Sequence, residues 1–78
     1  MQVTKLKEVY QELSDALATR DEQEVYEAAL WSAQKLANTT KDDVFAAYED
    51  LARSLAAQDV EETYEAAMHA VKVLSRYI

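Results

Sequence analysis

The sequence predicts an all-α fold of four helices, arranged as two tandem antiparallel helical hairpins. Three observations predict it: the 78-residue chain has no glycine or proline, its apolar residues recur at helical spacing, and one helical pattern occurs twice. Glycine and proline supply many of the turns of β folds, so their absence favours helices joined by short loops. The hairpins would form a four-helix bundle or a short α-repeat stack.

The repeated stretch is DEQEVYEAALWSAQKL at residues 21–36, which returns as DVEETYEAAMHAVKVL at residues 59–74. Seven of the sixteen positions are identical at an offset of 38 residues, and the match continues upstream from Tyr10/Tyr48 to Ala18/Ala56. A period of this length indicates a supersecondary unit that packs against its copy. We therefore predict a single domain, residues 1–78, made of two internal repeats at about 3–38 and 41–76.

The spacing of apolar residues predicts helices over about residues 5–18, 22–37, 41–57 and 60–77. Asp21 and Asp59 precede the second and fourth helices, and each is followed three residues later by a glutamate. This is the pattern of a capping box, with aspartate in place of serine or threonine. In the loop between the repeats, Asn38 is expected to adopt a left-handed conformation and Thr40 to cap the third helix.

The predicted core follows one apolar stripe on each helix. Equivalent positions of the second and fourth helices carry Leu30 and Met68, and both are expected on the core side. Tyrosines on these stripes form two repeat-related pairs, in which the ring packs and the hydroxyl reaches the edge of the core. The four residues are Tyr10, Tyr26, Tyr48 and Tyr64.

The charge balance excludes one class of partner. Fifteen acidic residues outnumber eight basic ones, giving a net charge of −7, so direct nucleic-acid binding through phosphates is not expected. Many of the acids stand where helices should begin, as the helix dipole favours. No stretch of about 18 apolar residues predicts a membrane span. The chain has no cysteine, and its first residues lack the apolar run of a signal peptide, so we expect a cytoplasmic protein without membrane contact.

The sequence offers no catalytic, cofactor-binding or metal-binding set. His69 is the single histidine, and no second ligand or nucleophile accompanies it on the polar side of the fourth helix. Glu27 and Glu65 occupy equivalent positions, but the Glu-x-x-His pairs of bundle metal sites are missing. We therefore expect no enzyme, no cofactor and no metal.

The two repeats differ most in a second row on the fourth helix, where Ser32 is replaced by Ala70 and Lys35 by Val73. This apolar row either meets a third helix or forms a seam between two copies of the chain. Trp31 lies off the core stripe of the second helix and is a residue type that binding hot spots favour. The candidate interaction residues are Trp31, Ala66, Ala70, Val73 and Tyr77.

Residues 21–36 resemble the second helix of a HEAT repeat through Val25, Ala28, Ala29, Ala33 and Leu36, and Leu13 and Leu17 suit its first helix. The second copy matches at Ala66, Ala67, Val71 and Leu74, with Thr63 in place of the valine. The family's usual arginine is replaced by tyrosine and its proline is absent. Tetratricopeptide-like hairpins are a competing resemblance. Either resemblance implies antiparallel helix pairs that serve as a protein-binding scaffold.

These observations predict a small acidic protein–protein interaction module that forms a homodimer or binds another protein. One alternative is a de novo designed or engineered repeat protein with no biological activity, suggested by the regular period and caps. The other is an acidic inhibitor or immunity-type protein that masks a basic surface.

Overall fold

The computed structural model describes residues 3–78, which fold into four α-helices and contain no strand, so the predicted all-α fold is confirmed. The chain ends in a short 3₁₀ turn, η1. None of the four described helices has both the length and the apolar character needed to cross a lipid bilayer. The elements are α1 (Val3–Thr19), α2 (Glu22–Leu36), α3 (Asp42–Ala57), α4 (Val60–Leu74) and η1 (Ser75–Tyr77).

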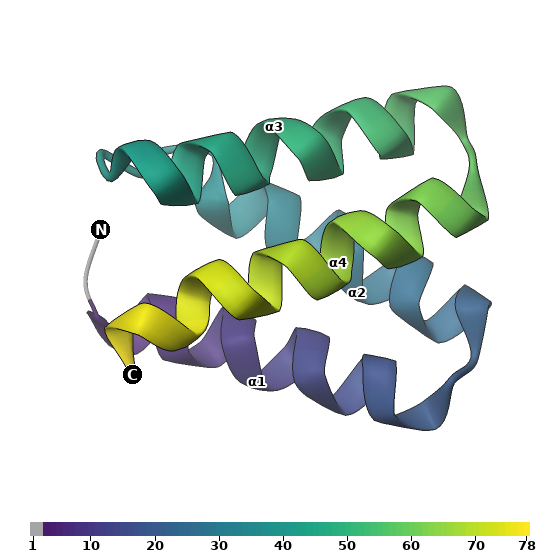
Figure 1. Ribbon diagram of the computed structural model, residues 1–78, viewed down its shortest axis with the longest axis horizontal. Coiled ribbons are helices and arrows are strands. Elements are labelled where there is room, and N and C mark those ends of the chain that lie inside the picture. Colours follow the sequence, from purple (N-terminus) through teal and green to yellow (C-terminus); the bar gives the residue numbers. More distant parts are fainter. Residues whose placement is uncertain (1–2) are drawn as a thin grey trace.

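The helices form a bundle in which α2 and α4 are central (Figure 1). Helix α1 packs against α2 and α4, and α3 packs against α4 and α2. Within the described residues α1 and α3 make no contact, and Figure 1 shows them on opposite sides of the central pair. Stacked repeats related by translation would place the first helices of each unit side by side. Here the first helix of each hairpin instead contacts the second helix of the other hairpin.

The N-caps of α2 and α4 adopt the same geometry, as their repeated sequence predicts. Asp21 and Asp59 have φ of −98° and ψ of 112° and 111°. The Asp21 carboxylate accepts from the Gln23 N–H at 2.9 Å, and the Asp59 carboxylate accepts from the Glu62 N–H at 3.2 Å. These side-chain caps are confirmed. The reciprocal half of the capping box forms at neither position: the Asp21 N–H donates to Thr19 Oγ1 at 3.2 Å, and the Asp59 N–H donates to the Ser54 carbonyl oxygen at 3.4 Å.

The turns within the hairpins use left-handed residues that are not glycine. Arg20 and Gln58, again 38 residues apart, have φ of 57° and 56° and are the positive-φ residues of the described chain. The expectation for Asn38 was wrong, because the turn that reverses the chain tightly lies inside each hairpin and not between them. Lys41, rather than Thr40, is the N-cap of α3, and it makes no side-chain cap.

The core repeats as faithfully as the backbone does. Every buried position of the first hairpin has a buried equivalent 38 residues later, including Leu13/Leu51 and Leu36/Leu74. Val73 is the additional buried residue of the second hairpin, and its equivalent, Lys35, is half-buried.

Leu30 and Met68 depart from the predicted core, since they are 43% and 48% exposed. The neighbouring stripe of each helix faces the bundle, and it includes Val25 and Thr63, both fully or almost fully buried. A helical pattern identifies an apolar face but does not show which edge of that face the neighbouring helices cover.

Candidate functional site

The five residues that the sequence predicts for interaction do not share a surface. Ala66, Ala70 and Val73 are buried within the single chain, at 8%, 0% and 4% exposure. Helix α4 contacts α1, α2 and α3, so the chain's own helices cover this row. A seam between two copies cannot be built from side chains that are already inside the bundle. Of the five residues, Trp31 and Tyr77 are half-buried.

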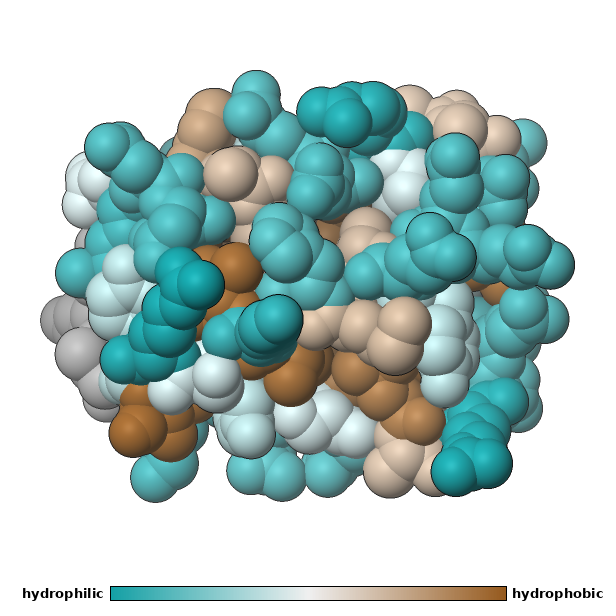
Figure 2. All heavy atoms as spheres, viewed as in Figure 1, coloured by the Kyte–Doolittle hydropathy of each residue, from teal (hydrophilic) through white to brown (hydrophobic). Residues whose placement is uncertain are grey.

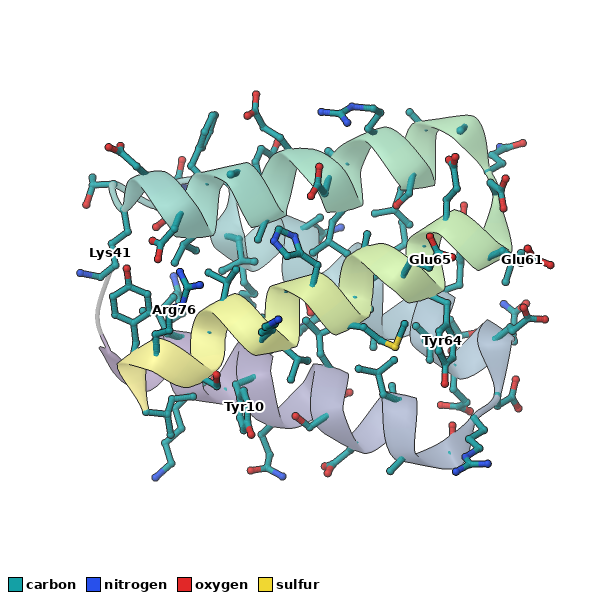
Figure 3. All side chains as sticks on the ribbon, viewed as in Figure 1. Tyr10, Lys41, Glu61, Tyr64, Glu65 and Arg76 are labelled. Carbon is teal, nitrogen blue, oxygen red and sulfur yellow. The ribbon has the colours of Figure 1, made fainter. Side chains whose placement is uncertain are left out.

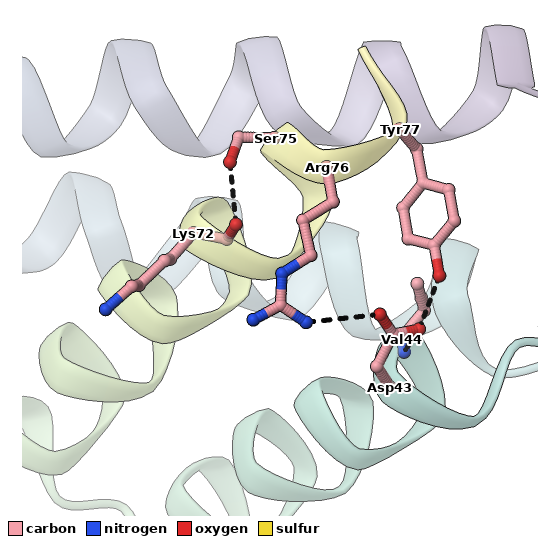
Figure 4. A network of polar contacts seen from close by, with 6 residues as sticks. All are labelled: Asp43, Val44, Lys72, Ser75, Arg76 and Tyr77. Atoms are coloured by element: carbon pink, nitrogen blue, oxygen red, sulfur yellow. Dashed lines mark hydrogen bonds and ion pairs between the residues drawn. The ribbon is translucent and has the colours of Figure 1, made fainter.

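Tyr77 belongs to a polar contact that joins the C-terminal turn to the start of α3 (Figure 4). Its hydroxyl donates to Asp43 Oδ1 at 2.6 Å, and Arg76 Nη1 lies 3.5 Å from the other carboxylate oxygen. The Tyr77 hydrogen bond is the main cause that lowers the pKa of Asp43, and the same bond raises the pKa of Tyr77. Lys41 Nζ lies 5.0 Å from the centroid of the Tyr77 ring. Tyr77 therefore links the C-terminal turn to the start of α3.

The surface carries one groove on each hairpin, and the two grooves occupy equivalent positions of the repeat. The first groove lies between α1 and α2 and encloses about 330 Å³; the second lies between α3 and α4 and encloses about 290 Å³. The first groove is lined by Glu12, Asp15, Ala16, Thr19, Glu24, Glu27, Ala28 and Trp31. The second is lined by Asp50, Arg53, Ser54, Glu62, Glu65, Ala66 and His69. Each residue of the second groove stands 38 positions after a residue of the first.

The second groove balances part of its charge internally. Arg53 Nη1 lies 3.6 Å from Asp50 Oδ1, and His69 Nδ1 lies 3.1 Å from Asp50 Oδ2. The other two carboxylates, Glu62 and Glu65, are exposed, and Glu65 projects from the first half of α4 in Figure 3. This groove therefore has three carboxylates and one guanidinium in addition to His69.

The first groove has no such balance. Its four carboxylates belong to Glu12, Asp15, Glu24 and Glu27, and no basic side chain lines it. Among the described residues none of the four forms an ion pair. Two glutamine side chains, one on α1 and one on α2, contact two of these carboxylates instead. Gln11 donates to Asp15 at 3.1 Å, and Gln23 donates to Glu27 at 3.4 Å. Asp15 stands where the second groove has Arg53.

Trp31 is the aromatic residue of the first groove and stands where the second groove has His69. Its ring is half-buried against the core, and Lys35, one turn later, holds its Nζ 5.5 Å from the ring centroid. Trp31 was expected off the core stripe, and its ring packs in part against the core. The sequence did not reveal the carboxylates around it, because Glu12 and Asp15 come from the other helix of the hairpin.

The face drawn in Figure 2 carries a second kind of surface. Apolar side chains gather along the border between α4 and α1, and hydrophilic ones cover most of the rest. The exposed Met68 and the half-buried Leu17 and Val71 belong to these two helices. Tyr10 and Tyr64 extend from the same two helices in Figure 3 and pack against the core, so this border is apolar.

Within residues 3–78 no three histidine, aspartate or glutamate side chains are grouped so that they could hold a metal ion. Comparison of the chain with protein-family models, with curated proteins and with solved structures finds no match. The resemblance to HEAT or tetratricopeptide-like repeats stays a prediction from the sequence.

Proposed function

We propose that this protein is a protein–protein interaction module whose first groove binds a positively charged segment of another protein. The observation that carries the proposal is the difference between the two grooves. The same backbone holds four carboxylates without an ion pair around Trp31 in one hairpin, and a partly neutralised set around His69 in the other.

Charge complementarity favours a basic partner for two reasons. Carboxylates that face one groove repel one another, and a cationic segment would reduce that repulsion on binding. The net charge of −7 also attracts such a segment from a distance and speeds its encounter with the groove. Trp31 adds a half-buried aromatic surface at the side of the groove, of the kind that anchors interfaces.

The test is a titration with the peptide (Lys-Ser)₄ followed by fluorescence of Trp31, which is the single tryptophan of the chain. We expect binding that weakens as salt rises, because salt screens exposed charges. The double substitution Glu24→Gln and Glu27→Gln should weaken binding about threefold or more. The matched control is Glu62→Gln with Glu65→Gln, at the equivalent positions of the second groove, and it should have a smaller effect.

Equal losses in the two double variants would show that net charge alone attracts the peptide and would overturn the assignment to the first groove. Absence of salt-sensitive binding to the wild-type protein and to both variants would overturn the proposed function. Binding of (Glu-Ser)₄ with similar affinity would do the same.

Self-association is a second candidate, and the apolar border between α1 and α4 favours it. Met68, which is 48% exposed, and the half-buried Leu17 and Val71 belong to these two helices. Light scattering after size exclusion should then show a homodimer, and Met68→Glu should dissociate it while leaving the helical circular dichroism unchanged. The control is Leu30→Glu, at the equivalent position on the opposite hairpin. A monomer at high protein concentration would rule this candidate out.

A further inference from the structure

The contact between Lys35 and Trp31 distinguishes the first groove from its copy in a second way. Lys35 Nζ lies over the Trp31 ring at 5.5 Å from the centroid, and both side chains are half-buried. The face of an aromatic ring attracts a cation, and tryptophan does so most strongly. The ring is therefore already occupied by a cation that belongs to the chain itself.

The second hairpin has no lysine at the equivalent position. The equivalent residue is Val73, which is 4% exposed and packs in the core of the second hairpin. Lys35 also forms no ion pair with a described carboxylate, although Trp31, which it contacts, lines the acidic first groove. Its ammonium group therefore makes one specific contact, which is the contact with the ring of Trp31.

An arginine from another chain could use the same ring face more fully than Lys35 does. A guanidinium group is planar and stacks on an aromatic ring, and its N–H groups remain able to bind carboxylates in pairs. Glu24 and Glu27 line the groove together with Trp31 and come from the same helix. Lys35 belongs to that helix as well, and its single ammonium group is already placed over the ring.

We propose that Trp31 is the anchor position of the first groove, that it receives an arginine side chain of the partner protein, and that Lys35 acts as an internal competitor which the arginine displaces. This inference rests on the proposed function, since it names the side chain that the first groove selects. It assigns the partner segment to an arginine-containing class and makes Lys35 a residue that limits affinity.

The experiment compares (Arg-Ser)₄ with (Lys-Ser)₄ on four proteins; titration calorimetry measures the affinity, and Trp31 fluorescence reports contact with the ring. The variant Lys35→Val introduces the residue found at the equivalent position, and Lys35→Gln is a second variant in case valine perturbs the helix. Lys72→Gln is the matched control, because it removes one positive charge and introduces the residue that its own equivalent position carries. Circular dichroism checks that each variant is folded.

We expect the wild-type protein to bind the arginine peptide about two- to fivefold more tightly than the lysine peptide, with a change in Trp31 fluorescence. Each Lys35 variant should gain about two- to fivefold in affinity for the arginine peptide relative to Lys72→Gln. Binding by a Lys35 variant alone would also support the inference, since the competitor would then be strong.

An affinity in both Lys35 variants equal to or below that of Lys72→Gln would overturn the role of Lys35. Arginine-peptide binding that leaves the fluorescence of Trp31 unchanged would overturn its role as anchor. Both of these results leave the proposed function standing, because the groove would still bind a basic peptide. Loss of all binding in every protein would overturn the proposed function and the inference together.

Discussion

In the first hairpin the groove between α1 and α2 holds four carboxylates around Trp31, whereas in the second hairpin the same groove holds Arg53 and His69 beside Asp50. The backbone beneath them hardly differs, since the caps at Asp21 and Asp59 agree within a degree or so in φ and ψ. The hairpins therefore share the positions that build the bundle, although not always the residues at those positions. The exposed residues that they do not share give each groove its own charge.

The largest effect on stability is expected when a core leucine is removed from each hairpin, which tests whether the two hairpins are equivalent. Leu36 and Leu74 are equivalent and fully buried, so Leu36→Ala and Leu74→Ala should each lower the free energy of unfolding by about 2–5 kcal/mol. Urea denaturation followed by circular dichroism measures the change. Because α2 and α4 are both central, the two losses of unfolding free energy should be similar. Two separate unfolding transitions, of which only one responds to each substitution, would show that the hairpins unfold independently.

A buried serine gives the next largest effect. Ser32 is fully buried and its hydroxyl finds no partner among the described residues, whereas the equivalent residue is Ala70. An unsatisfied buried hydroxyl is costly, so Ser32→Ala should raise the free energy of unfolding by about 1 kcal/mol. The reverse change, Ala70→Ser, should lower it by about 1–3 kcal/mol. Chemical denaturation should therefore show a gain in stability for Ser32→Ala and a loss for Ala70→Ser. A loss in both variants would mean that the Ser32 hydroxyl has a hydrogen-bond partner in solution.

Substitution of the left-handed turn residues should change the stability by similar amounts in the two hairpins, and by less than the changes at Ser32 and Ala70. Arg20 and Gln58 carry a Cβ at φ near 57°, where glycine avoids a steric cost. Glycine also loses more freedom on folding, so Arg20→Gly and Gln58→Gly should each stabilise by only about 0.5 kcal/mol. Arg20→Ala and Gln58→Ala are the controls, since alanine keeps the Cβ. Thermal melting separates the two pairs, and alanine variants as stable as the glycine ones would contradict the steric explanation.

The smallest effect is expected at the half-buried contact between Tyr77 and Asp43, and it depends on pH. The Tyr77 hydroxyl lowers the pKa of Asp43, so this stabilisation is present above about pH 4 and is lost as the pH falls through the lowered value. Asp43 raises the pKa of Tyr77, so the same stabilisation is lost as the pH rises through that value, above about pH 10. It is therefore complete between these limits.

Tyr77→Phe should accordingly lower the melting midpoint near neutral pH, and the difference from the wild-type protein should shrink toward both extremes. Calorimetry over that range measures it. A difference that does not change with pH would show that the ring alone, and not its hydroxyl, stabilises the C-terminal turn. Tyr10→Phe, which removes a hydroxyl on another helix, is the control.

Much of the fold follows from local signals that the chain repeats. The four helices and the aspartate caps were predictable, because each depends on neighbouring residues. The exposure of Leu30 and Met68 was not, because it depends on how the hairpins rotate against each other. The burial of Val73 was not predictable either, because the sequence allowed it to pack against a third helix or against another chain.

The grooves were even less accessible to sequence reasoning. Trp31 and His69 could be singled out because they differ between the copies, but the Asp50 partner of His69 lies on a different helix. The replacement of Asp15 by Arg53 is visible once the repeats are aligned at 38 residues. That substitution was the available signal for the difference in charge, and it becomes meaningful only when both residues are known to line grooves.

The interleaved packing of the hairpins has a consequence for the integrity of the molecule. Because α1 packs against α4 and α3 packs against α2, each hairpin supplies the surface that the other lacks. The loop between Leu36 and Asp42 keeps the two hairpins close together but contributes no buried apolar residue. Separate peptides covering the two hairpins should therefore reassemble into the same bundle, and a protease cut in this loop should leave a two-chain complex held together without a covalent bond.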